Sequence, residues 1–250
     1  MKTTIPPLVG ANAAAPAKKA LQGWPVLRLG FRPFYLVTAA LACLAVPLWV
    51  AAMLGAITLD VAVAPMLWHA HEMLLGFATG VIVGFLLTAV KAWTGLQTPR
   101  GAALGALVLL WIAARVAAWV GPYPVYALLD VVLLPAVAVI LLRILLRAGN
   151  KRNLPLVGIL LLLSLANLCF HLSVMGWVEI APTSPLYAAL GLIVLVECVM
   201  AGRVIPAFTM SVNPGLKIAV PQWLERAAIA SMALGLALWV FAPAGWPGFV

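Results

Sequence analysis

The chain has very few charged side chains for its length. Its 250 residues include 15 Lys and Arg and 6 Asp and Glu, so charged residues make up 8% of the sequence and hydrophobic residues 66%. A soluble domain carries about 25% charged residues. A chain this apolar cannot cover a water-facing surface, so its composition excludes an ordinary soluble domain and indicates that lipid is its solvent.

Other common signals are missing as well. The three cysteines, Cys43, Cys169 and Cys198, lie apart within apolar runs and form no CxxC pair, so a disulfide framework has no support. The sequence contains no GxxxxGK[ST], HExxH or GxSxG motif, which removes the usual signs of nucleotide binding and hydrolysis. The formal charge of +9 lies in short loops, where membrane orientation signals belong, and indicates no nucleic-acid partner.

Long apolar runs take up most of the chain. A membrane span needs about 20 mostly apolar residues, and backbone groups in lipid must be paired within the segment, so each run is expected to be a helix. The sequence therefore predicts an all-α, polytopic transmembrane bundle over residues 34–250, with about seven spanning helices. The predicted spans are roughly 34–56, 66–90, 102–120, 125–147, 155–177, 185–206 and 227–246.

The basic residues predict the orientation of the bundle. Residues 1–33 are rich in Ala, Pro and basic residues and lack the apolar core of a signal peptide, so they are predicted to be a cytoplasmic tail. Fourteen of the fifteen basic residues lie in this tail or near the loops on the same side. The loops on the opposite side contain no Lys or Arg, and their charged residues are Asp60 and Glu179. The positive-inside rule therefore predicts a cytoplasmic N-terminus.

Ionisable residues inside predicted spans are costly and mark candidate functional sites. Here they are His69, His71, Glu72, Arg115, Asp130, His171 and Glu197. The predicted orientation places all three histidines in the outer half of the membrane, with Arg115 and Asp130 at the same level. We interpret Arg115 and Asp130 as an intramembrane ion pair in preference to a transport device.

Helical periodicity predicts two polar stripes. One runs through His69, Glu72 and Met73 and continues as Gly76, Gly80 and Gly84. The other runs through Ser164, Asn167, His171 and Met175. On an ideal helix His71 lies about 200° from His69, so these two cannot face one point. We interpret the glycine stripe as helix packing in preference to a cofactor slot.

The sequence allows two hypotheses for the role of the histidines. They ligate haem or copper, for which neutral imidazole is a favoured ligand, or they only form hydrogen bonds between helices. Glu72 and Asn167 are candidate partners of a ligating histidine or proton-relay groups. The thioethers of Met73 and Met175 suit Cu(I), although methionine more often serves packing.

Several segments together resemble the NnrS family. The most specific is Trp68–Ala78 (WHAHEMLLGFA), which continues through Gly84–Val90 to Trp93–Gly95. Supporting matches, in order along the chain, are Phe31–Phe34, Arg152–Pro155, Ala166–Asn167 with Phe170–His171, and Gly202–Thr209. At residues 91–92 the chain has Lys-Ala where NnrS-like chains often show Asn before Trp-Thr-Gly.

This resemblance implies a multi-pass protein of the bacterial inner membrane that contains haem, of b type, and copper. It implies a role in nitric oxide metabolism and resistance to nitrosative stress, with nitric oxide or iron–nitrosyl species as partners. His69, His71 and His171 are then the candidate ligands, without assignment of either metal to a particular histidine. The resemblance also implies about twelve spans, which is more than the roughly seven counted in this chain at about 20 residues each, so this chain corresponds to the N-terminal portion.

Two rival functions stay open at this stage. A proton-coupled transporter would line a polar pathway with Glu72, Arg115, Asp130 and Glu197. A b-type cytochrome for electron transfer would need two strong axial ligands. The sequence indicates no electron partner or quinone site, which leaves the turnover of nitric oxide open.

Overall fold

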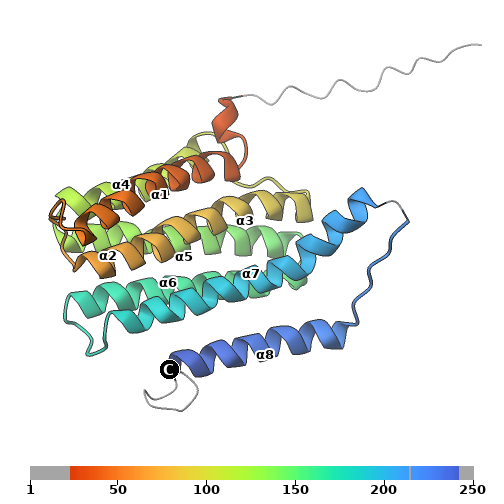
Figure 1. Ribbon diagram of the computed structural model, residues 1–250. Helices are drawn as coiled ribbons and strands as arrows, with labels where there is room; N and C mark the ends of the chain where they lie inside the picture. The colour runs from red at the N-terminus through yellow and green to blue at the C-terminus, as the bar shows by residue number, and fades with distance from the viewer. Residues whose placement is uncertain (1–22, 214, 242–250) are drawn as a thin grey trace, which may run out of the picture.

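The computed structural model describes residues 23–213 and 215–241, and these residues are helical with no strand (Figure 1). Seven of the helices are long and apolar enough to cross a membrane, so the predicted all-α, multi-pass fold is confirmed. The helices are α1 (Phe31–Met53), α2 (Pro65–His71), α3 (Thr79–Thr94), α4 (Ala102–Val120), α5 (Tyr123–Arg147), α6 (Leu154–Val174), α7 (Thr183–Val212) and α8 (Gln222–Phe241). A π-helical segment, η2 (Glu72–Ala78), joins α2 and α3 into one span, and short 3-10 turns η1 (Pro25–Leu27) and η3 (Lys151–Asn153) precede α1 and α6.

Most predicted spans agree with the helices to within a few residues, and α4 has the predicted bounds. The main difference is α7, which continues through Pro206 to Val212 although the prediction ended the span at residue 206. A proline removes one backbone hydrogen bond, and a membrane helix tolerates this when neighbouring groups satisfy the carbonyl. The last helix begins at Gln222, before the predicted 227, and its predicted end at 242–246 lies outside the described residues, as does most of the predicted tail.

The core lies where α3, α4, α5 and α6 face one another. From α4 to α8, helices adjacent in the chain pack side by side, and α3 packs against α1 and α5. Fully buried aliphatic side chains such as Val83, Leu104, Val137 and Leu163 fill the space between them. By contrast, α8 packs against α7 at the edge of the bundle, and no side chain of residues 222–240 is buried.

Two glycines allow the close contact between α1 and α3. A Cβ atom on Gly80 would lie 2.5 Å from Thr38 Cγ2, and one on Gly84 would lie 2.8 Å from Phe34 Cβ. The first helix therefore fills the groove along the glycine stripe. This agrees with the interpretation of the stripe as helix packing, and it leaves no slot there for a flat cofactor.

We expect Gly84→Ala to destabilise the protein by about 1–3 kcal/mol, the usual cost of overpacking. The new methyl group would meet Phe34 Cβ and the Cα of Phe31 at 3.3 Å, atoms next to the backbone that cannot move aside independently. Thermal unfolding of the detergent-purified protein measures the effect.

The matched control is Gly158→Ala in α6, where the added Cβ meets nothing within 4 Å. It should leave the unfolding temperature unchanged or raise it slightly, because Ala has a higher helix propensity than Gly. Equal unfolding temperatures for the two variants would contradict the packing account.

Candidate metal centre

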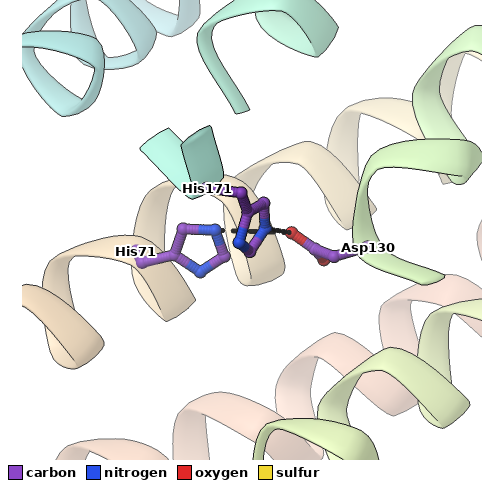
Figure 2. A group of neighbouring side chains, drawn as sticks. All are labelled: His71, Asp130 and His171. Carbon is purple, nitrogen blue, oxygen red and sulfur yellow. Dashed lines mark hydrogen bonds and ion pairs between the residues drawn. The ribbon is translucent and has the colours of Figure 1, made fainter. Parts of the chain in front are cut away.

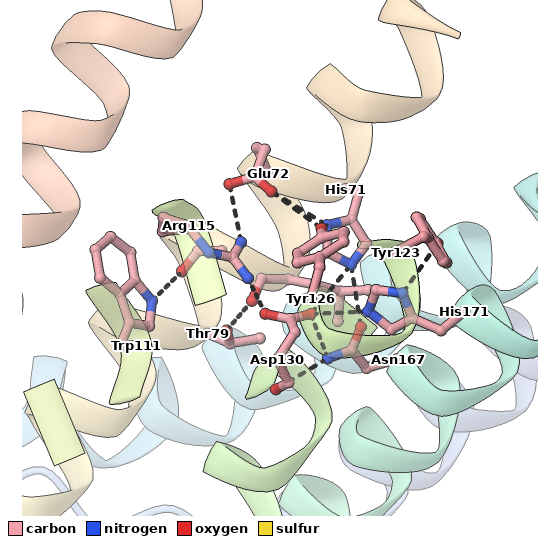
Figure 3. Close-up of polar contacts among 12 residues, drawn as sticks. His71, Glu72, Thr79, Trp111, Arg115, Tyr123, Tyr126, Asp130, Asn167 and His171 are labelled. Atoms are coloured by element: carbon pink, nitrogen blue, oxygen red, sulfur yellow. Dashed lines mark hydrogen bonds and ion pairs between the residues drawn. The ribbon is translucent and has the colours of Figure 1, made fainter. Parts of the chain in front are cut away.

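Four transmembrane segments bring polar side chains together at one end of the bundle. We call this group the polar cluster, and Figure 3 shows most of its contacts. Its members are His71 and Glu72 from the second span, Arg115 from α4, Tyr123, Tyr126 and Asp130 from α5, and Asn167 and His171 from α6. All except the half-buried Tyr123 are buried. By the positive-inside rule, the loop charges predict that this end faces the outside.

Two histidines converge on one carboxylate oxygen within the cluster. Asp130 Oδ2 lies 3.3 Å from His71 Nε2 and 3.1 Å from His171 Nε2. One ligand atom from each of the three residues lies within 4.8 Å of the other two, so the group can hold a metal ion (Figure 2). Two imidazoles and one carboxylate form a donor set that divalent first-row metals bind.

A tyrosine hydroxyl meets the other nitrogen of each histidine. Tyr126 Oη lies 3.0 Å from His71 Nδ1, and Tyr123 Oη lies 3.0 Å from His171 Nδ1. Metal-ligating histidines nearly always have such a partner on the second ring nitrogen, which sets the tautomer and the ring orientation. The two tyrosines therefore hold both Nε2 atoms towards Asp130.

Asn167 completes the surroundings of the carboxylate. Its Nδ2 donates to Asp130 Oδ2 at 2.8 Å, and its Oδ1 lies 3.0 Å from His71 Nε2. Because Asn167 Oδ1 and Asp130 Oδ2 are both acceptors, His71 Nε2 carries the proton when no metal is bound. The Phe170 ring stacks on His71 with a centroid distance of 4.5 Å and closes the site on its apolar side.

Arg115 neutralises part of the negative charge in the cluster. Its guanidinium donates to Glu72 Oε2 at 2.8 Å through Nη1, and it forms an ion pair with Asp130 Oδ1 through Nη2. It also lies 5.8 Å from the ring centroids of Trp111 and Tyr126, within cation–π range. The predicted ion pair is thus part of a three-residue network that also includes Glu72.

The charges of this network do not balance. With neutral histidines, one guanidinium faces the two carboxylates of Glu72 and Asp130, which leaves one net negative charge among buried residues. An uncompensated charge away from water is costly. A proton on a histidine or a bound metal cation would offset it.

The π-helical segment η2 places Glu72 against Arg115. A π-helical turn takes up more residues than an α-turn and often occurs at functional sites. Trp111 Nε1 donates to the carbonyl oxygen of Gly76 in this segment at 3.2 Å. A Cβ atom on Gly76 would lie 2.6 Å from Arg115 Nη1, so the missing side chain makes room for the guanidinium.

Other candidate residues lie outside the cluster. His69 is half-buried, and its ring stacks on Trp49 with a centroid distance of 4.0 Å. Met73 and Met175 are half-buried and make no polar contact with the cluster among the described residues. Glu197 lies on the exposed side of α7, facing an apolar groove, so it does not join Glu72, Arg115 and Asp130.

Sequence reasoning missed Tyr123 and Tyr126. Both precede Asp130 on α5, at spacings of seven and four residues, so they share its face of the helix. That spacing was a usable signal, because a tyrosine hydroxyl inside a span needs a polar partner just as a carboxylate does.

The cluster suits a single metal ion better than a haem held by both histidines. The imidazole centroids of His71 and His171 lie 5.2 Å apart, and Asp130 Oδ2 contacts both Nε2 atoms. A porphyrin plane between the two rings would have to replace that carboxylate. The described residues therefore fit a metal ion at this position and do not fit a haem there.

The comparisons with known proteins give one match. The family model described as "NnrS protein" matches residues 25–250. Comparisons with curated proteins and with solved structures find no match for this chain.

We expect Arg115→Met to destabilise the protein by about 3–5 kcal/mol, because it leaves two buried carboxylates without their cation. Combining it with Glu72→Gln should recover part of the loss, since one of the two negative charges is then removed. Thermal unfolding in detergent gives both values.

Arg143→Met is the control, because Arg143 lies on α5 as an exposed residue outside the cluster. We expect a change within about 0.5 kcal/mol, as for most surface substitutions. A stability of Arg115→Met equal to that of the control would refute the central role of the ion-pair network.

Proposed function

The chain belongs to the NnrS family, and we propose that it is a copper-binding protein of the bacterial inner membrane that protects against nitrosative stress. The observation that carries this proposal is the convergence of His71 Nε2, His171 Nε2 and Asp130 Oδ2 in a buried, negatively charged cluster. Its multi-pass membrane character and its family membership support the same role.

Copper is the metal proposed for this site. Imidazole nitrogens suit copper, and Cu(II) has the highest affinity among the divalent first-row metals for such a site. A bound metal with three protein ligands would offer an open position to nitric oxide. The same donor set also suits non-haem iron(II), so metal analysis of the purified protein decides between the two ions.

The chain's own residues can exchange a proton as the metal binds. If Nε2 held the metal, the His71 proton would lie on Nδ1 and would be donated to Tyr126 Oη, which lies at 3.0 Å. The Tyr126 hydroxyl would then donate to Glu72 Oε1 at 3.3 Å. Without metal, His71 Nδ1 and Glu72 Oε1 are both acceptors for the single Tyr126 proton, so a metal on Nε2 would end that competition.

The surroundings of the cluster also favour nitric oxide as the molecule that the bound metal would take up. Nitric oxide is small and nearly apolar, so it partitions into lipid and reaches a buried site without a water-filled channel. The stacked Phe170 ring and the buried aliphatic side chains around the cluster exclude bulk water. Such a site admits a diatomic gas and excludes larger polar substrates.

Haem, which the family resemblance also implies, needs a ligand outside the His71–His171 pair. The sequence contains three histidines, so His69 is the candidate that is left. Its Nδ1 atom has no hydrogen-bond partner among the described residues, and its ring is held against Trp49. We propose His69 as the residue to test for haem binding.

The two rival functions have less support. A b-type cytochrome with His71 and His171 as axial ligands requires a porphyrin between rings that Asp130 already bridges. A transporter with four acidic and basic groups along one pathway requires Glu197, which lies away from the other three on the exposed side of α7.

We expect the wild-type protein to bind about one copper ion per chain. The His71→Ala, His171→Ala double variant should bind none at the same free copper concentration, because two of the three ligands are lost. Tyr126→Phe should weaken copper binding by about 10–100-fold, the usual cost of losing the partner of a ligating histidine. Metal analysis after dialysis against defined copper measures both.

The matched control for the ligand variants is His69→Ala, which removes a histidine outside the group. It should keep full copper content, whereas any bound haem should be lost, as the optical spectrum would report. Full copper content in the folded double variant would sink the assignment of His71 and His171 as ligands.

In cells that lack the native protein, we expect expression of the wild-type chain to improve growth in the presence of a nitric oxide donor. The double variant should give no protection, because the metal that binds the gas is absent. Growth rates are compared at matched membrane levels of each protein. Protection by a folded, copper-free variant would separate the stress response from the metal site and overturn the proposal.

A further inference from the structure

A second pocket lies at the opposite end of the bundle from the polar cluster. It has a volume of about 700 Å³ and lies between the ends of α3 and α7, the η3 turn that precedes α6, and α8. Its polar residues are Asn150, Arg152, Asn153, Arg203 and Glu225. Its other walls are apolar, with Val199, Ala207 and Ile229 among them.

Hydrogen bonds hold the guanidinium of Arg203 in position at the polar side of this pocket. Nη1 donates to Asn153 Oδ1, and Nη2 donates weakly to the carbonyl oxygen of Arg152 at 3.5 Å. Asn153 is oriented in turn by its own hydrogen bond to Asn150 Oδ1 at 3.0 Å. Arg203 Nε is buried and has no hydrogen-bond partner among the described residues. A buried donor without a partner is costly, so a ligand acceptor at this point would stabilise the site.

The charges in the pocket favour an anion. Two guanidinium groups, from Arg152 and Arg203, face the single carboxylate of Glu225, which leaves a net positive charge. Arginine forks match the paired oxygens of a phosphate better than any other side chain does. A carboxylate beside a phosphate repels it, but Glu225 can accept a hydrogen bond from a hydroxyl group attached to that phosphate.

The surroundings of the pocket identify the source of the phosphate. The basic loops of this end assign it to the cytoplasmic side of the membrane by the positive-inside rule. Basic pockets between transmembrane helices on that side bind anionic lipid headgroups. Because apolar walls of α7 and α8 continue from the basic residues, the pocket suits a ligand with a phosphate at one end and a hydrocarbon chain at the other.

We propose that this pocket binds an anionic glycerophospholipid of the cytoplasmic leaflet. Its phosphate lies between Arg152 and Arg203, a headgroup hydroxyl donates to Glu225, and an acyl chain packs between α7 and α8. The lipid then links α8, which has no buried side chain among residues 222–240, to the rest of the bundle. This proposal is independent of metal binding at the polar cluster.

The test measures the thermal stability of the full chain in detergent during titration with phosphatidylglycerol. Phosphatidylcholine with the same acyl chains controls for general lipid effects, and inorganic phosphate controls for a soluble anion. We expect saturable stabilisation with phosphatidylglycerol only. The Arg152→Gln, Arg203→Gln double variant should need about tenfold more lipid for half the effect, as expected from the loss of charge-assisted hydrogen bonds.

Two further variants keep the test decisive if the double variant does not fold. Arg152→Gln alone changes an exposed side chain and leaves the Arg203–Asn153 contact in place, and it should still weaken the effect of the lipid. Arg143→Gln removes an exposed arginine outside the pocket and should respond like the wild type.

Equal stabilisation by phosphatidylcholine, or an unchanged response of Arg152→Gln, would overturn the lipid site. Stabilisation by inorganic phosphate at the same concentrations would overturn the lipid as the source and indicate a soluble phosphate ligand. Copper content is measured on the same samples. It should not change with Arg152→Gln, so failure of this proposal is distinguishable from failure of the metal site.

Discussion

The buried guanidinium of Arg115 is the constraint around which the polar cluster of this bundle is organised. A charge this deep in a membrane protein requires partners within hydrogen-bond distance, because lipid offers none. Glu72 and Asp130 meet that need from two other segments, which brings the second span, α4 and α5 to one point. Asp130 then has an oxygen left over, and His71, Asn167 and His171 gather around it. The candidate metal site therefore uses a carboxylate that the ion pair already holds in place.

Backbone geometry adapts locally to this cluster. The π-helical segment Glu72–Ala78 interrupts an otherwise continuous span, and Gly76 leaves room for the guanidinium beside it. Further along the same span, Gly80 and Gly84 let α1 approach α3 closely. Asp130 Oδ2 already contacts both Nε2 atoms, so the position between the two histidines can hold an ion and does not fit a porphyrin.

The two ends of the bundle present opposite chemistry. One end buries two carboxylates, two histidines and one arginine, and this arrangement favours a metal cation. The other end carries arginines and amides around a pocket with apolar walls, and this arrangement favours an anion with a hydrocarbon tail. The positive-inside rule predicts such an asymmetry, because basic side chains are expected to collect on the cytoplasmic side, near anionic lipid headgroups. The polar cluster and the lipid pocket can then be altered independently by substitution.

The sequence by itself determined the membrane class, the number of spans and most helix bounds, because hydrophobicity over about 20 residues is a local property. It also identified His71, Asp130, Asn167 and His171 as candidates, since polar groups inside spans are rare. Only the tertiary structure decided which of them meet. The stripe through His69, Glu72 and Met73 did not predict the cluster: Glu72 joins His71, while His69 packs on Trp49. Asn167, for example, contacts Asp130 and His71, which lie 37 and 96 positions away in the sequence, and no helical period can report distances between different helices.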